Sequence, residues 1–268
     1  MNNRNIWCYD LEIFRNFFSC LAINIYTNET VKFVLLKDKI NQIDDLRKWL
    51  KSPNLILIGY NNLEFDYQLL HIILTSSESI NTLIDELYNR TQVLVDNNIH
   101  RFEKNIIPEW QHLITQLDLY KISHFDNKNR RTSLKWLEFA LRMHNVQDLP
   151  ISPHAEVSED QVDDILKYNY NDVLATLNYF NAVNSWGKEI MKEAIQLRSN
   201  ISKEYDLDVM NANDVKIGVM ILGKKLSKAM GISYKQLKKL STKRDSINLG
   251  DCILPYIKFE SKGFNALL

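Results

Sequence analysis

The apolar and polar positions of the first 36 residues follow the pattern of β-strands. Apolar, aromatic and β-branched residues fill the segments 6–14, 20–26 and 31–36, and Asn28 lies in the connection between the last two. This arrangement of strand-like segments and a turn residue predicts an antiparallel meander.

The pattern then alternates between helix and strand. Apolar residues three and four positions apart indicate helices, and short apolar runs bounded by turn residues indicate buried strands. The elements predicted in this way are a helix over 43–50, a strand over 55–58, a helix from about 67, a strand over 113–119 and a helix over 133–143. The segment 79–107 has a mixed pattern that predicts no definite element.

A long helix is predicted to follow the proline-containing loop 145–157. The tetrapeptide 158–161 has serine at the N-cap and glutamine at the third helical position, which is the pattern of a capping box. Strands followed by alternating strands and helices predict a mixed α/β domain over residues 1–185.

The remaining residues, 186–268, are predicted to form a smaller, mostly helical and basic region. The segment 215–244 contains nine lysine or arginine residues and no acid. Such a run either forms a solvated helix face or contacts phosphates. A strand is expected over 252–259 with nothing after it to pair with, so the chain is expected to stop within a larger fold.

Composition narrows the class of protein. Of the 268 residues, 45% are hydrophobic and 25% charged, as in ordinary globular proteins. The net charge is zero, so any nucleic-acid surface has to come from local clustering. The three cysteines form no close pair, and no apolar run approaches the roughly 18 residues of a membrane span. We expect reduced thiols and a cytoplasmic protein, in the cytoplasm of the host cell if a phage encodes it.

Two acids stand on the first predicted strand. Asp10 and Glu12 are two positions apart, and because side chains alternate between the faces of a strand, both project to one face. The opposite face carries Trp7, Tyr9 and Leu11. An edge strand with its acidic face in water would explain the pair, whereas a central strand would need something that compensates two charges.

Two further acids could meet this pair. Asp66 lies between the strand 55–58 and the helix that follows it, and Asp172 lies on the late helix. Tyr168 is four residues before Asp172 and therefore shares its helix face. Each acid alone is compatible with a surface position. If all four carboxylates converge they repel one another, and hard divalent cations such as Mg²⁺ or Mn²⁺ would offset the repulsion. Two such ions about 3.5–4 Å apart are a known arrangement for phosphodiester cleavage.

Together these residues resemble the three motifs of the DnaQ-like, or DEDD, 3′–5′ exonucleases. The motifs are Asp-x-Glu at 10–12, Asn-x-x-Phe-Asp at 62–66 and Tyr-x-x-x-Asp at 168–172, and the tyrosine marks the DEDDy branch. The segment 133–137, Ser-Leu-Lys-Trp-Leu, is similar to a further motif in the proofreading domains of phage family B-type DNA polymerases. The resemblance covers about residues 5–180. It implies an RNase H-like fold, with a mixed central sheet flanked by helices.

The resemblance also implies roles for individual residues. Asp10, Glu12, Asp66 and Asp172 would hold two Mg²⁺ or Mn²⁺ ions. Tyr168 would orient the attacking water, since a tyrosine with an ordinary pKa of about 10 stays protonated at neutral pH and is suited to positioning.

A second group of residues would bind the nucleic acid. By the resemblance, Asn62 would hydrogen-bond the frayed 3′ end, Phe65 would stack on a base, and Ser133 and Leu134 would grip the single strand. Phe65 is also compatible with a core aromatic residue at a helix start. Four basic residues lie in or near the segment 133–137, and they either contact phosphate or belong to a solvated loop. They are Lys128, Arg130, Arg131 and Lys135.

Two positions are less defined. Phage members of the family use a lysine before the third motif to steady the phosphate, but the loop 146–157 contains no lysine, so this role is unassigned or falls to another residue such as Lys167. Asp118 ends the strand 113–119, where capping or loop hydrogen bonding is favoured over a role beside the metal.

We therefore expect a metal-dependent 3′–5′ exonuclease that removes 3′-terminal deoxynucleotides, with the 3′ end of single-stranded DNA as its partner. A polymerase portion, in the same polypeptide or a separate subunit, would be a second partner. Two alternatives stay open, an RNA-trimming exonuclease of the RNase D kind and a non-catalytic single-strand-binding module of a polymerase. The first differs in its readout of the 2′-hydroxyl, and the second would bind without metal and without cleavage.

Overall fold

The structure, a computed structural model, describes residues 5–266 except 101, 128, 130, 241–245, 247, 249, 251–253 and 255. By its internal contacts the chain divides into two units, residues 1–218 and 219–268. The first unit contains the sheet and all four acids singled out above.

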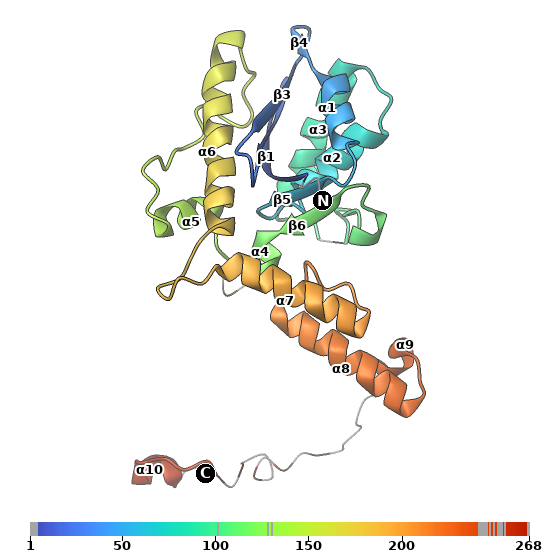
Figure 1. The fold of residues 1–268 in the computed structure, drawn as a ribbon, viewed down its shortest axis with the longest axis vertical. Coiled ribbons are helices and arrows are strands. Elements are labelled where there is room, and N and C mark those ends of the chain that lie inside the picture. The colour runs from blue at the N-terminus through green and yellow to red at the C-terminus, as the bar shows by residue number, and fades with distance from the viewer. Residues whose placement is uncertain are drawn as a thin grey trace. The chain divides into compact units, whose positions relative to one another are not determined.

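A six-stranded mixed sheet forms the centre of the first unit (Figure 1). Its strands are β1 (Ile6–Phe14), β2 (Phe17–Asn24), β3 (Thr30–Leu36), β4 (Ile40–Asn41), β5 (Ile56–Gly59) and β6 (Thr115–Asp118). They lie in the order β4-β3-β2-β1-β5-β6, with β1 to β4 antiparallel in succession and β5 and β6 parallel to β1. The predicted meander is confirmed, with Asn28 in the left-handed region at φ 58°. β2 begins three residues earlier than predicted because a turn of two residues joins it to β1, where Phe14 pairs with Phe17.

Seven helices of the described chain belong wholly to this unit. They are α1 (Ile43–Leu50), α2 (Asp66–Thr75), α3 (Ile80–Val95), α4 (Leu119–Ile122), α5 (Leu134–Ala140), α6 (Val162–Phe180) and α7 (Ile190–Tyr205). The helix predicted over 43–50 has the predicted bounds, and the capping box at 158–161 is present, with the short 3₁₀ turn Glu159–Gln161 leading into α6. The helix predicted over 133–143 ends earlier, at Ala140.

The helices cover the sheet on both faces (Figure 1). One face of β1, formed by Trp7, Tyr9 and Leu11, packs into a core shared with α1, α2 and α3. The other face lies against α6, where Cys8 packs with Val173. β1 is hydrogen-bonded to β2 on one side and to β5 on the other, so the edge-strand explanation for its acidic face is wrong.

The segment after residue 185 is bound to the sheet through buried polar side chains. Arg198 of α7, 1% exposed, donates hydrogen bonds to the carbonyl oxygens of Ile122, Ala194 and Ala212 and to the carboxylate of Asp214. Asn211 donates to the Gln116 carbonyl at 3.0 Å and accepts from the Asp118 amide at 2.9 Å, thereby pairing the outer edge of β6. Through these contacts the first unit includes residues beyond 185. That a functional domain ends at residue 185 stays a prediction.

The regular elements in the described part of the second unit are helices. It holds the later part of α8 (Asp214–Met230), together with α9 (Tyr234–Leu237) and α10 (Lys262–Asn265). A side chain at Gly223 would collide with the Tyr234 ring, so glycine allows α8 and α9 to approach each other. In the segment 252–259 predicted as a strand, the described residues form none, and 252, 253 and 255 lie outside the described residues. No helix in the described part of the chain is long and apolar enough to cross a membrane.

We predict that Arg198→Met lowers the free energy of unfolding by about 3 kcal/mol, because the buried carbonyl groups of Ile122 and Ala212 lose their donor. Urea denaturation measures the change. The matched control is Asp214→Asn, which keeps an acceptor oxygen, removes only the charge of a side chain that is 84% exposed, and should change stability by less than about 1 kcal/mol. Equal losses in the two variants would contradict the prediction.

Candidate metal centre

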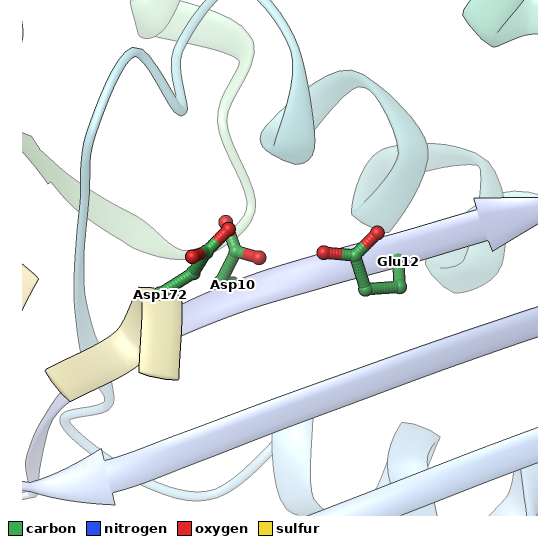
Figure 2. A group of neighbouring side chains, drawn as sticks. All are labelled: Asp10, Glu12 and Asp172. Carbon is green, nitrogen blue, oxygen red and sulfur yellow. The ribbon is translucent and has the colours of Figure 1, made fainter. Parts of the chain in front are cut away.

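The candidate site begins with two acids on the inner face of β1. Asp10 and Glu12 project to the same side of the strand, as predicted, and face α6 (Figure 2). Both are half-buried. At both positions β1 is paired with β2, where Asp10 lies opposite Leu21 and Glu12 opposite Ser19, so the strand fixes the spacing of the two carboxylates.

A third carboxylate reaches them from α6. One oxygen each of Asp10, Glu12 and Asp172 lies within 4.8 Å of the others (Figure 2). α6 holds its position because Ile165 and Val173 are fully buried against the sheet side of the helix. Residues 10, 12 and 172, far apart in the sequence, therefore converge as predicted.

Asp66 stands beside this group but is not one of the three. It is the first residue of α2 and is 6% exposed. Its charge raises the pKa of both Asp10 and Glu12, so it acts on the same electrostatic centre. Hydrogen bonds from its own backbone amide and from that of Leu11 hold its carboxylate toward β1.

The cluster is electrostatically costly without a cation. Burial is the largest cause that raises the pKa of each carboxyl group, and repulsion between the groups adds to it at Asp10 and Glu12, whose pKa lies well above the ordinary range. Burial also raises the pKa of Asp66 to about 8 and that of Asp172 to about 7. The ammonium group of Lys135 lowers the pKa of Asp172 and offsets only part of this effect. A donor set made of carboxylate oxygens fits hard divalent ions such as Mg²⁺ or Mn²⁺.

Tyr168 lies next to the acids, one turn before Asp172 on α6. Its hydroxyl donates a hydrogen bond to the Asp172 carboxylate, and burial together with the nearby negative charges raises its pKa. The side chain therefore stays protonated at neutral pH, in agreement with a positioning role and against a role as a base.

Comparison with known proteins adds no relative. A scan against models of protein families found no match for this chain, and a search of curated proteins found none either. The chemistry of the site is therefore inferred from its geometry and from the resemblance of its motifs.

The side chain of Asp118 stabilises the turn between β5 and Asp66 through hydrogen bonds. This buried carboxylate accepts hydrogen bonds from the backbone amides of Asn61 at 3.0 Å and Leu63 at 3.3 Å, and from two amides at the start of α4. The favoured expectation for Asp118, capping and loop hydrogen bonding, is thus confirmed. The same capping ends β6 at Asp118, where the sequence had suggested a longer strand.

Asn62 lies beneath the site rather than on its surface. It is fully buried, and its amide donates to the Gln116 side chain at 2.8 Å, which also accepts from the Tyr9 hydroxyl. Gly59 carries no side chain, because a Cβ there would lie 2.5 Å from that of Asn62. The predicted contact of Asn62 with a strand end would need an exposure that this structure does not have.

Phe65, the residue before Asp66, lines a hollow of about 630 Å³. The ring is half-buried and packs partly against the core, which agrees in part with the core expectation, while stacking on a base stays a prediction. Tyr120 and Arg131 line the same hollow. An aromatic ring, a phenol and a guanidinium group together suit a nucleotide.

A second hollow, of about 590 Å³, shares Tyr120 and Arg131 with the first. Ser133, Leu134 and Trp136 line it. Ser133 is the N-cap of α5, and its oxygen accepts a hydrogen bond from the Trp136 amide at 3.1 Å. The Trp136 side chain is 59% exposed, which leaves a large aromatic surface beside the predicted strand-binding residues.

The basic residues differ in their relation to the site. Lys135 forms an ion pair with Asp148 and acts electrostatically on Asp172. Lys167 forms an ion pair with Asp164 at 2.9 Å, and both side chains are exposed on α6. Lys128 and Arg130 lie outside the described residues.

Sequence reasoning missed two polar residues that touch the site. Asn169, fully buried, donates to the Asp10 carboxylate at 3.1 Å. Glu138 of α5, 2% exposed, accepts from Asn171 at 2.6 Å and raises the pKa of Asp172. For Asn169 a signal was present, since it interrupts the apolar helical spacing from Ile165 onward with an amide.

We predict that the metal-free protein loses stability as the pH rises from about 4 to about 8. The pKa of Asp66 is about 8 in the folded protein against an ordinary 3.8, so in this range the folded state holds a proton that the unfolded chain releases. Thermal unfolding in EDTA should show a larger loss for the wild type than for Asp66→Asn. Added Mn²⁺ should raise the midpoint more at pH 8 than at pH 5, whereas parallel pH curves for the two proteins would contradict the prediction.

Proposed function

We propose that this chain is a metal-dependent 3′–5′ exonuclease that removes 3′-terminal nucleotides from single-stranded DNA. The observation that carries the proposal is the convergence of Asp10, Glu12 and Asp172 within 4.8 Å, with the buried Asp66 beside them. A simple binder of a polyanion has no use for such a concentration of negative charge, whereas two-metal phosphodiester hydrolysis needs it.

The fold supports the same proposal. Three long antiparallel strands, two further strands parallel to the first, and helices on both faces are compatible with the RNase H-like fold that the motif resemblance implies. We infer from the resemblance that the chain is the proofreading part of a phage replicative DNA polymerase, whose polymerase portion lies in the same polypeptide or in another subunit.

The residues would divide the work as follows. When bound, two Mg²⁺ or Mn²⁺ ions would lower the pKa of a water and stabilise the leaving 3′-oxygen. Asp10, Glu12, Asp66 and Asp172 would hold them. The Tyr168 hydroxyl, fixed by its bond to Asp172, would orient the attacking water by hydrogen bonding.

The two hollows that share Tyr120 and Arg131 would supply a path for the strand. Phe65 and Trp136 offer ring faces on which bases of any sequence can stack, and Arg131, which lines both hollows, offers a charge for the phosphates. Leu134 adds an apolar wall to the second hollow. Such a surface suits binding without sequence preference, as the removal of any terminal nucleotide requires.

We predict that the wild-type chain with Mg²⁺ shortens a 5′-labelled DNA oligonucleotide from its 3′ end, giving a ladder that EDTA abolishes. Asp172→Ala should reduce the rate by more than about 100-fold, because it removes a direct metal ligand. Asp164→Ala, an exposed acid on the same helix, is the matched control and should retain the activity. No ladder from folded wild-type protein, even with Mn²⁺, would contradict the proposal, and preferential shortening of an RNA of the same sequence would favour the RNA-trimming alternative.

We predict that Tyr168→Phe lowers kcat by about 10- to 100-fold, because the water loses its orienting hydroxyl. The oligonucleotide KM should change little, since the ring stays in place. Steady-state kinetics measure both, with Tyr170→Phe, which alters an exposed tyrosine of the same helix, as the control. A change confined to KM would mean that Tyr168 binds substrate and does not orient water.

A further inference from the structure

Asn169 is a buried amide for which the proposed function has no use so far. It is fully buried where α6 lies on β1. Its Nδ2 donates a hydrogen bond to Oδ2 of Asp10 at 3.1 Å, and the same side chain is a hydrogen-bond donor to the carboxylate of Glu12. One neutral group thus contacts two carboxylates that repel each other.

The other half of this amide is unsatisfied. The Asn169 Oδ1 atom is buried and finds no hydrogen-bond partner among the described residues. An unpaired buried carbonyl lowers stability, so packing alone would favour an apolar side chain at this position, as at Ile165 and Val173 on the same side of the helix. The reason for an amide at this position therefore lies in its NH₂ group, which donates to the acids.

We propose that Asn169 is a positioning residue of the metal centre. Its amide group, carried by the rigid backbone of α6, fixes the orientation of the Asp10 and Glu12 carboxylates so that each presents a free oxygen toward Asp172. A metal ion then meets ligands already in place. Without the amide, the two carboxylates rotate apart, and binding has to bring them back together. This inference rests on the proposed function, because it needs a metal ion at the carboxylates.

The experiment measures Mn²⁺ binding by isothermal titration calorimetry on the full chain. Asn169→Leu keeps the size of the side chain and removes the donor, and Asn169→Ser is a second variant with a smaller polar group. We expect the dissociation constant for Mn²⁺ to rise by about 10- to 100-fold in both variants. Asn178→Ala is the control, because it removes an exposed amide of the same helix; its Mn²⁺ affinity should match the wild type.

Cleavage of the DNA oligonucleotide as a function of Mn²⁺ concentration separates positioning from general damage to the fold. The Asn169 variants should need more Mn²⁺ for half-maximal rate and should regain most of the wild-type kcat at saturation. Wild-type Mn²⁺ affinity in a folded Asn169 variant would overturn the inference, and so would a rate that saturating Mn²⁺ does not restore. Absence of Mn²⁺ binding by the wild type would instead overturn the proposed function.

Discussion

The repulsion between carboxylates held on rigid elements is the constraint on which the centre of this protein depends. Asp10 and Glu12 are fixed by a strand that is paired with β2 at both positions, and Asp172 by a helix that buries Ile165 and Val173. None of these backbones can withdraw to relieve the charge. The folded protein can therefore lower the energy of the cluster in two ways, by binding protons or by binding cations. The raised pKa values of the carboxyl groups reflect the binding of protons. At neutral pH, with divalent ions available, the proposed cation binding would compete with protonation.

Hydrogen bonds from other polar groups hold the backbone around the acids in place. Asp118 holds the turn that leads to Asp66 with two hydrogen bonds, and Asn211 binds the open edge of β6 on the far side. A hydrogen bond between the side chains of Asn62 and Gln116 joins the same turn to β6. Each contact joins residues distant in the sequence. A site whose first function is to keep like charges close together needs this kind of support, since the acids themselves contribute none.

The sequence predicted the parts of this structure that local periodicity or motif spacing determines. β1, α1 and the capping box of α6 agree closely with the predicted segments, because apolar spacing and cap chemistry act over a few residues. The convergence of residues 10, 12 and 172 came from motif resemblance. The burial of Asn62 was missed because its partner, Gln116, lies 54 residues away and no local pattern marks the pair. The attachment of the segment after 185 was missed for the same reason, since Arg198 and Asn211 act through backbone groups of other elements, which carry no sequence signal.

The ordered motifs and the absence of a family match are compatible on physical grounds. A core tolerates many apolar substitutions so long as volume and pattern are kept, so most of the chain can diverge without loss of the fold. The acidic positions have no such freedom. A carboxylate moved by one residue along β1 would point into the opposite core with Tyr9 and Leu11, and one moved along α6 would leave the face that carries Tyr168 and Asp172. Residues fixed by charge and geometry are too few to identify a family by overall similarity, yet they are the ones that would determine the proposed chemistry. Their placement in space, which a single metal-binding measurement can test, is therefore a better guide to this protein than its overall similarity to others.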